Sequence, residues 1–491
     1  MAAQITITQP RVLLDDPHAC TDSSDVLSVF SALFDALVRR NDSGGYEPAL
    51  ATRWTVSGDA RTYRFTLRDG LRFHDGTICD AAAVRFCLER MARPDMGATL
   101  GAPGVYAQYL AGMTVEVFSP LDLQVTLAEP IADLFDILVY GHIVSPTAIE
   151  AAGDDLPARA VGTGPYRLES YEPGEKLTVR AFSDHYAGPP AYDQITWIRG
   201  ESAADRLEKL IDGRADVANA LDHAAWDASG VTRHDYLAPT AIIFLLNAQR
   251  GPGADPRVRL ALNLAIDRAA LVQEVLHGAG QPLHGFVSPV HVGADPDAPP
   301  FARDLTEARR LLAEAGYGDG LTLQLFCPTR LPDEAQELAA AVGRQLAEVG
   351  VGFDVHLEAD RTRYANQVRL KQIHDLCVFD SSPMSAFRVL HEKIDARVKG
   401  SWWEGYENRA IEALIDQARR TVDPAARTAL HRQCFRLLQQ DPPWLYLYLH
   451  RRTIALRGAH PTWRMRPDGV LDVRRLPAEL SPAPASPARS R

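Results

Sequence analysis

The stretch that most constrains the fold of this chain is 242–280, where a short apolar run leads into a helical pattern. Residues 242–246 are all apolar, which is typical of a strand buried on both faces. Asp255-Pro256 then predicts a helix start, because aspartate caps a helix and proline is tolerated at the first helical position. Apolar residues recur at three- and four-residue steps until Gly278, where glycine can end a helix. We therefore expect one buried strand and one helix, as in α/β proteins.

A second strand–helix–strand pattern lies further along the chain. Residues 321–326 and 351–357 read as strands around a helix at 334–349, and this order favours parallel pairing. A third strand is expected at 376–379, followed by two capped helices, 408–420 and 423–440. The N-terminal half differs, because 63–67, 115–118 and 123–127 alternate apolar and polar residues as half-buried strands do.

Length and charge exclude some classes of protein. A chain of 491 residues is too long for a single core, so two or three domains are expected. The net charge of −11 argues against a nucleic-acid partner, and no apolar run approaches the roughly 18–20 residues that cross a bilayer. The first residues lack the basic and apolar regions of a secretory signal. Either a signal has been removed, or the protein stays in the cytoplasm.

The chain contains none of the sequence signatures of common enzyme or metal centres. HExxH, GxSxG, a Walker loop and zinc-ligand spacing are all missing from the sequence. Six cysteines lie far apart without a CxxC pair, which leaves one or two disulfides open and favours burial as small hydrophobic residues. We expect no cofactor, no resident metal and no catalytic residues, although a hydrolase whose groups meet only in space stays possible.

Several motifs carry a family resemblance. They are LLNAQRGPGADPRVRLALNLAIDRAALVQEVLHGAG, YEPALATRWTVSGDARTYRFTLRDGLRFHDG, VGTGPY, DHYAGPPAYD and AADRLEKLIDGRAD. Together they resemble family 5 of the solute-binding proteins of ABC transporters, which includes peptide-, dipeptide- and nickel-binding receptors. The resemblance spans residues from about 45 to about 450. In that family FHDG is a structural corner, so His74-Asp75 is expected to be structural as well.

The resemblance implies a fold and a function. The fold would be a two-lobed, periplasmic-binding-protein-like α/β fold of type II, in the large peptide-binding class, with an additional inserted subdomain. Lobe I would comprise 1–37, 160–241 and 447–477, the inserted subdomain 38–159, and lobe II 242–446, with a disordered tail at 478–491. The protein would capture a small solute, by default a short peptide, by hinge closure between the lobes, and deliver it to ABC permease subunits in the membrane. A monomer located in the periplasm, or elsewhere outside the cytoplasm, would fit this role.

Two residues are the expected anchors of the ligand. Asp380 follows the strand at 376–379, and in peptide receptors an aspartate here pairs with the amino terminus of the ligand. Only Ser381-Ser382 separates it from Pro383, one residue fewer than is usual in the family. Arg330 stands where dipeptide receptors carry an arginine for the ligand carboxylate, a task that suits the planar guanidinium. A helix cap at Asp380 and a surface position for Arg330 stay open.

Further candidates are aromatic or basic. Trp402, Trp403 and Tyr406 could form an aromatic wall, although successive residues of an extended segment point to opposite faces. Arg388 is a weaker candidate, and His18 lies in the loop DDPHAC, where turn and capping roles compete with ligand contact.

Two other functions stay open at this stage. The first is a receptor for a metal chelate such as a nickel complex, which the DDPHAC loop and the short spacing after Asp380 both suggest. The second is a cytoplasmic ligand sensor built on the same domain.

Overall fold

The computed structural model describes residues 3–97, 102–223, 230–330 and 332–480. The chain divides into unit 1, Met1–Tyr236 with Arg452–Arg491, and unit 2, Leu237–Arg451. The chain passes from one unit to the other within two long strands, β12 (Val231–Leu246) and β17 (Trp444–Arg457). Most of the expected disordered tail, residues 481–491, lies outside the described residues.

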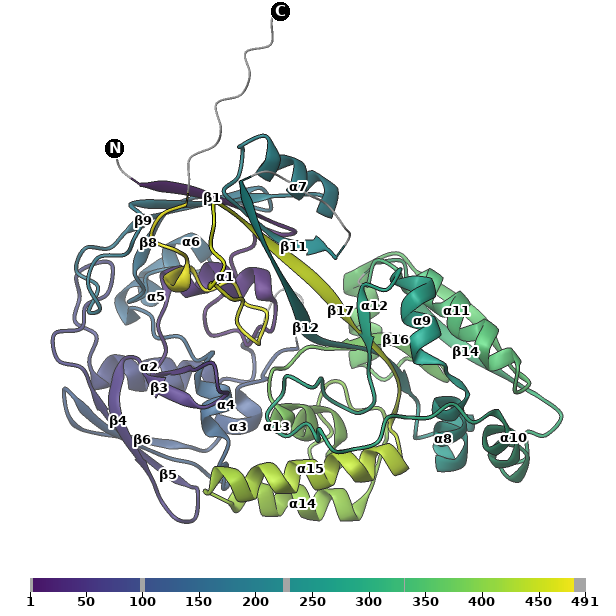
Figure 1. Ribbon diagram of the computed structural model, residues 1–491. Helices are drawn as coiled ribbons and strands as arrows, with labels where there is room; N and C mark the ends of the chain where they lie inside the picture. The colour runs from purple at the N-terminus through teal and green to yellow at the C-terminus, as the bar shows by residue number, and fades with distance from the viewer. Residues whose placement is uncertain (1–2, 98–101, 224–229, 331, 481–491) are drawn as a thin grey trace, which may run out of the picture. The chain divides into compact units, whose positions relative to one another are not determined.

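The main sheet of unit 1 is built around β1, which runs parallel to both of its neighbours, β10 and β11. Antiparallel β9 and β8 continue the sheet beyond β10, and β17 pairs antiparallel with β11 (Figure 1). The strands are β1 Gln4–Gln9, β8 Tyr166–Glu172, β9 Lys176–Ala181, β10 Gln194–Arg199 and β11 Val217–Asp222. The helices α1 Ser24–Leu33 and α7 Ala203–Ile211 belong to the same part of the unit.

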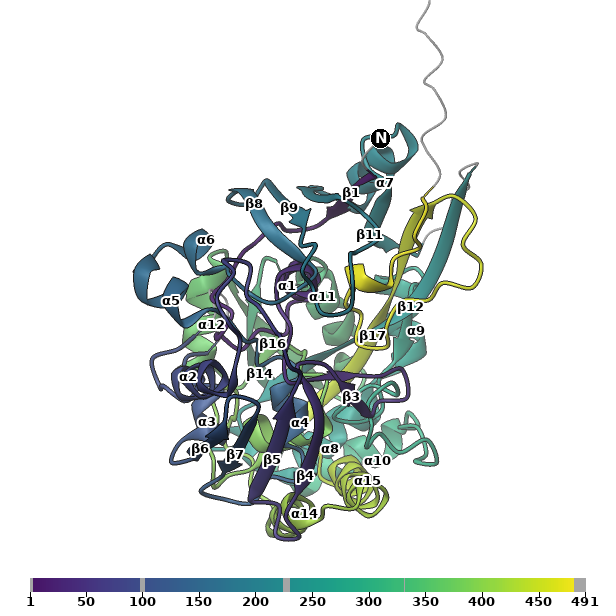
Figure 2. The same ribbon diagram turned by 90° about the vertical axis from the view of Figure 1, so that its left-hand side faces the viewer.

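A smaller antiparallel sheet of unit 1 has the order β4-β5-β7-β6 (Figure 2). The expected alternation is confirmed in β5, where Tyr63, Phe65 and Leu67 are buried. Asp80 caps the helix α2, because its side chain accepts hydrogen bonds from the first turn of that helix. The elements of this region are, in chain order, β2 Val38–Arg40, β3 Tyr46–Pro48, β4 Ala51–Val56, β5 Thr62–Leu67, α2 Ala81–Met91, α3 Ala107–Leu110, β6 Thr114–Ser119, β7 Asp122–Thr126, α4 Leu134–Leu138, α5 Pro146–Ala152 and α6 Leu156–Arg159.

The VGTGPY motif brings the chain against the end of α1. A Cβ on Gly162 would lie 2.1 Å from the Leu33 carbonyl oxygen, and one on Gly164 would lie 2.4 Å from that of Ala32, so both positions require glycine. His74 fixes the same segment, since its two ring nitrogens hydrogen-bond to the backbone of Gly162 and Gly164. The FHDG corner therefore has a structural role at His74.

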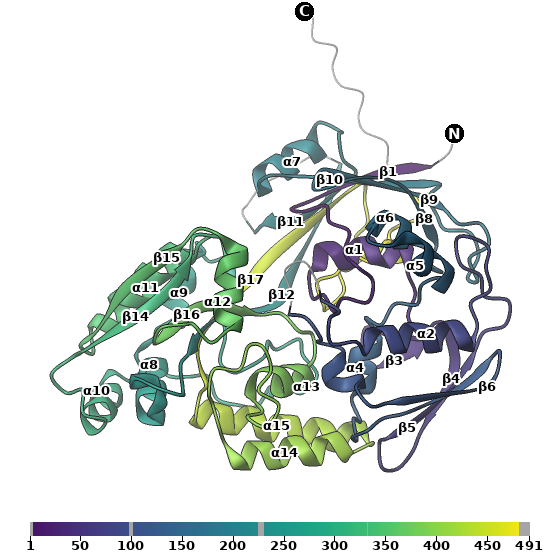
Figure 3. The same cartoon turned by 180° about the vertical axis from the view of Figure 1, so that it is seen from behind.

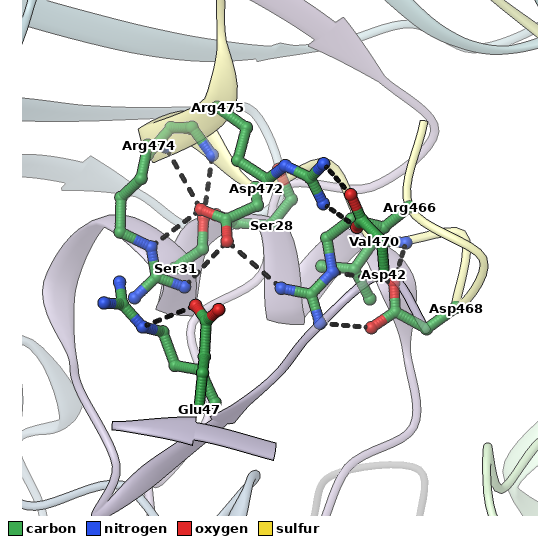
Figure 4. Close-up of polar contacts among 12 residues, drawn as sticks. Ser28, Ser31, Asp42, Glu47, Arg466, Asp468, Val470, Asp472, Arg474 and Arg475 are labelled. Carbon is green, nitrogen blue, oxygen red and sulfur yellow. Dashed lines mark hydrogen bonds and ion pairs between the residues drawn. The ribbon is translucent and has the colours of Figure 1, made fainter. Parts of the chain in front are cut away.

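The C-terminal segment of unit 1 is fastened by arginine–aspartate pairs (Figure 4). Arg475 forms a two-pronged contact with Asp42 at 2.6 and 2.7 Å, in the segment that contains the short 3-10 helix η3 (Val473–Arg475). Burial raises the pKa of Asp472, but the charges of Arg474 and Arg466 outweigh it and hold that pKa well below its usual range. Asp472 is therefore a buried carboxylate that is kept ionised by two arginines.

Unit 2 contains a sheet that is covered on both faces by helices (Figure 3). Its strands follow the order β15-β14-β16-β12, with β14 parallel to β15 and β16, so the expected parallel pairing is confirmed. Alternate residues of β12 enter two separate cores, Phe244 on one face and Ile243 on the other. Burial on both faces explains the uninterrupted apolar run at 242–246.

The helices of unit 2 divide between these two cores. Those of the core that contains Phe244 are α8 Pro256–Ala265, α9 Arg268–Val275, α10 Leu305–Glu314 and α11 Ala335–Ala347. Those of the opposite core are α12 Arg361–Arg369, α13 Ala386–Val389, the π-helix η2 Leu390–Ile394, α14 Arg409–Arg420 and α15 Pro424–Gln440. The remaining elements are η1 Pro252–Ala254, β13 Gly280–Pro282, β14 Leu321–Pro328, β15 Val351–Glu358 and β16 Leu376–Ser381.

The single helix expected after Asp255 is wrong, because the segment forms two helices. Ile266 adopts an extended conformation and ends α8, and Asp267 then caps α9 by accepting a hydrogen bond from Ala270 at 2.9 Å. The apolar spacing continues across this break, which is why periodicity alone did not find it. Asp267 was the available signal, since aspartate is a favoured N-cap residue.

Two further findings concern the described part of the chain. No described helix combines the length and the apolar character needed to cross a membrane. Five of the six cysteines form no disulfide within the described ranges and are buried, as expected for small core residues: Cys79, Cys87, Cys327, Cys377 and Cys434.

Candidate ligand-binding site

Three charged residues of unit 2 follow the carboxyl ends of neighbouring strands. Arg330 comes after β14 and Arg361 comes after β15. Asp380 is the second-to-last residue of β16. Because these strands are parallel, their carboxyl ends share one edge of the sheet, the edge where α/β proteins bind ligands. We refer to Arg330, Arg361 and Asp380 as the strand-end cluster.

Asp380 is available for an additional partner. Its side chain is 32% exposed, and its carboxylate makes no hydrogen bond with the described residues. Arg361 forms an ion pair with it, with Nη2 3.9 Å from Asp380 Oδ1, beyond hydrogen-bond distance. The Lys393 ammonium donates hydrogen bonds to the backbone carbonyl of Asp380 at 3.4 Å and to Ser381 Oγ at 3.1 Å.

Arg361 is positioned by the fold of α12. It is the first residue of that helix, and the preceding Asp360 caps the helix through the amides of Thr362 and Arg363. One turn later, the buried Tyr364 donates its hydroxyl to the Val378 carbonyl on β16 and stacks on Phe326 of β14. The Arg361 guanidinium lies 5.3 Å from the Tyr364 ring centroid, so the tyrosine that ties the helix to the sheet also supports the arginine.

Arg330 is the most open member of the cluster. It is exposed, and its side chain makes no hydrogen bond or ion pair with residues inside the described ranges. A guanidinium in this state can donate hydrogen bonds to a ligand carboxylate without breaking an existing contact.

The three aromatic candidates have different environments. Trp402 is half-buried and packs on Phe379, with ring centroids 5.0 Å apart. Trp403 is buried and donates its indole N–H to the Tyr406 carbonyl at 2.7 Å. Tyr406 is also buried, and its hydroxyl hydrogen-bonds to Asp441 at 3.1 Å. Trp402 alone of these three offers a partly accessible ring.

Glu404 lies in the same loop, and its carboxyl group has a raised pKa. It is buried, and its one close cation is Lys371, at 3.7 Å, among the residues that the structure describes. Burial raises the pKa of the Glu404 carboxyl to about 7, because the partial compensation by Lys371 is weaker than the loss of hydration.

Arg388 and His18, the two basic candidates, are both enclosed by protein. Arg388 is buried and pairs with Glu392. His18, in unit 1, is fully buried with Nε2 3.0 Å from the His142 carbonyl oxygen, and burial lowers its pKa to about 3. Its neighbour Asp16 forms ion pairs with Arg90 and Arg159, which also belong to unit 1.

Sequence reasoning missed Arg361 and Lys393. A usable signal existed for Arg361, because it follows a predicted parallel strand just as Arg330 and Asp380 do. Lys393 gave no such signal, since it reaches Asp380 from the π-helix η2 through tertiary packing. Within the described ranges, no group of three or more histidine, cysteine, aspartate or glutamate side chains could hold a metal ion.

Comparison with known proteins identifies the family. The family model described as bacterial extracellular solute-binding proteins, family 5 Middle, matches residues 45–386. The chain belongs to the family 5 bacterial extracellular solute-binding proteins. It is thereby grouped with transport binding proteins that act outside the cytoplasm, bind small ligands and work with ABC permeases.

Individual relatives agree with this family 5 assignment. The glutathione-binding protein GsiB of Salmonella paratyphi A is 28% identical over 90% of this chain and 87% of its own length. Among solved structures, the binding protein AgaA of A.tumefacien R10 in complex with agropinic acid has a TM-score of 0.80 and 22% identity, covering 96% of this chain and 98% of that one. DppA of Helicobacter pylori in complex with the peptide STSA has a TM-score of 0.78 and 19% identity, covering 96% and 97%. These structures confirm the expected two-lobed, peptide-binding class of fold.

Proposed function

We propose that this family 5 protein captures a short peptide or peptide-like solute and delivers it, chemically unaltered, to an ABC permease. The observation that carries the proposal is Asp380, a partly exposed carboxylate at the carboxyl end of a buried parallel strand, without a hydrogen-bond partner among the described residues. A carboxylate in this state can bind a ligand ammonium. The names of GsiB and of the DppA complex, a glutathione-binding protein and a peptide complex, support a ligand of this class.

The roles of the candidate residues follow from their surroundings. We assign Asp380 to the ligand ammonium, Arg330 to a ligand carboxylate and Trp402 to an apolar contact. Trp403, Tyr406, Arg388 and His18 are assigned to structural support, because each is buried with a protein partner.

The domain organisation is part of the same proposal. Lobe I comprises 1–37, 160–241 and 447–477, lobe II comprises 242–446, and 38–159 forms an inserted subdomain that includes the sheet β4-β5-β7-β6. Closure would bend the chain within β12 and β17, which both pass between the two units. The protein is proposed to act as a periplasmic monomer without enzymatic activity.

The experiment that tests this function is calorimetric titration with a panel of short peptides. For an amine-bearing ligand, Asp380→Asn should weaken binding at least tenfold, because loss of a buried charge partner costs on the order of 2–5 kcal/mol. Asp354→Asn is the matched control, since Asp354 is an exposed carboxylate on β15 of the same sheet. Equal affinity of Asp380→Asn and the wild type would contradict the assignment. Recovery of a cleaved ligand by mass spectrometry would contradict non-covalent capture.

A further inference from the structure

We propose that Asp380 and Arg361 together recognise an α-amino-acid head group, in which an ammonium and a carboxylate are attached to the same carbon. This inference rests on the proposed function and narrows its ligand class. The ligand would be an amino-acid conjugate, or a peptide linked through a side chain, rather than an ordinary α-linked peptide. In an α-linked peptide the carbon that bears the ammonium carries a neutral carbonyl group instead.

The first support is the geometry of the pair. Asp380 Oδ1 and Arg361 Nη2 are 3.9 Å apart, close enough to contact one small zwitterion but too far apart to hydrogen-bond to each other. The two side chains are 32% and 23% exposed, and neither forms a side-chain hydrogen bond with the described residues. A carboxylate that can accept hydrogen bonds and a guanidinium that can donate them therefore lie side by side.

The second support is the contrast with other arginines of unit 2. Arg388 donates to Glu392 at 2.9 Å, and Arg268 donates to the Tyr446 carbonyl at 2.9 Å, so these buried guanidinium groups are hydrogen-bonded within the protein. The Nε atom of Arg361, in contrast, is buried without a hydrogen-bond partner in the part of the chain that the structure describes. A guanidinium with unused donors next to a candidate ligand anchor is suited to a carboxylate.

The third support is electrostatic. A ligand ammonium that approaches Asp380 also approaches Arg361, because the two side chains lie 3.9 Å apart. A lone ammonium is therefore attracted by the carboxylate and repelled by the neighbouring guanidinium. A carboxylate on the same carbon offsets this repulsion, because it pairs with Arg361 while the ammonium pairs with Asp380. Bidentate guanidinium–carboxylate geometry adds directional selectivity.

The helix that carries Arg361 is also anchored to the strand that carries Asp380. Tyr364 hydrogen-bonds to β16 and packs on β14, which holds the first turn of α12 against the strand that carries Asp380. Preorganised partners lose less conformational entropy on binding, so the pair can discriminate between head groups that differ by a single charge.

The test uses two isomers that have the same composition and the same net charge. In γ-L-glutamylglycine the ammonium carbon carries a carboxylate, whereas in α-L-glutamylglycine it carries the peptide carbonyl. Calorimetric titration of the wild type should show at least tenfold tighter binding of the γ isomer. Arg361→Gln should reduce this preference to less than threefold, by weakening the γ isomer rather than by strengthening the α isomer.

The matched control is Arg363→Gln on the same helical turn. Arg363 is mainly exposed and pairs with Glu358, so its replacement should leave the preference unchanged. A thermal melt of each variant checks that the fold is intact. Arg361→Lys should retain part of the preference, because lysine keeps the positive charge but cannot form the bidentate contact of a guanidinium.

The outcomes separate this inference from the proposed function. Equal or tighter binding of the α isomer, or an unchanged preference in Arg361→Gln, would overturn the inference, while a tenfold loss in Asp380→Asn would still support peptide capture. Failure of both isomers to bind at millimolar concentration would also overturn the inference. Failure of the whole peptide panel would overturn the proposed function as well.

Discussion

Arg388 and Glu392 form a buried ion pair in unit 2, with Arg388 Nε 2.9 Å from Glu392 Oε1 and side chains that are 2% and 6% exposed. The pair joins α13 to the π-helix η2, the turn that also carries Lys393 toward Asp380. A basic residue that looked suited to a ligand is thus bound to a neighbour on its own helical segment.

Replacing one partner of this pair should strongly destabilise unit 2. Glu392→Ala leaves a buried guanidinium without its carboxylate, and we expect a loss of roughly 3–5 kcal/mol in the free energy of unfolding. Chemical denaturation measures the loss. The control is Glu314→Ala, which removes the exposed partner of Arg310 and should cost less than about 1 kcal/mol. Similar losses in both variants would contradict the structural role of Arg388.

Tyr406 should matter for stability and not for ligand affinity. Tyr406→Phe keeps the buried ring but removes the hydroxyl that donates to Asp441, which should cost about 1 kcal/mol of unfolding free energy. Denaturation and calorimetry on the same preparation check the two quantities. A tenfold loss of affinity with unchanged stability would show instead that the hydroxyl touches the ligand.

Glu404 should make the protein less stable as the pH rises from about 4.5 to 7. Its folded-state pKa of about 7 lies above the ordinary value of 4.5, so the folded state holds the proton more tightly. The resulting stability is complete below pH 4.5 and is lost as the pH passes 7, with a limit of roughly 3 kcal/mol. Glu404→Gln cannot ionise, so its unfolding free energy should depend less on pH in this window. The exposed Glu407→Gln serves as the control, and an unchanged slope in Glu404→Gln would refute the prediction.

His18 should have the opposite effect at acidic pH. Burial holds its folded-state pKa at about 3, below the ordinary 6.5, so the unfolded state binds the proton first. Stability is therefore lost as the pH falls from 6.5 toward 3. His18→Gln preserves a donor toward the His142 carbonyl but does not titrate, and its stability should fall less steeply. His142, with a pKa lowered to about 4 by burial, will retain part of the slope. An acid transition identical to that of the wild type would exclude a contribution from His18.

Local chemistry made many elements of the fold predictable. The caps at Asp255 and Asp423 are observed where the sequence indicated them, because a cap depends on a side chain and the amides two or three residues later. The apolar run at 242–246 correctly predicted a strand buried on both faces, because such a strand has no residue facing water and so needs no polar side chain. The break between α8 and α9 was missed because the core-facing spacing continues through it.

The sequence by itself determined the α/β class, most strand and helix starts, the family, and the prominence of Asp380, because these depend on patterns within short stretches. Tertiary structure decided which charges meet. The order β15-β14-β16 and the anchoring of α12 by Tyr364 bring Arg361 within 3.9 Å of Asp380, although 18 residues separate them along the chain. It also enclosed Arg388, Tyr406 and His18 among their own partners. Contacts of this kind depend on the pairing order of strands and on helix packing, which no local pattern specifies.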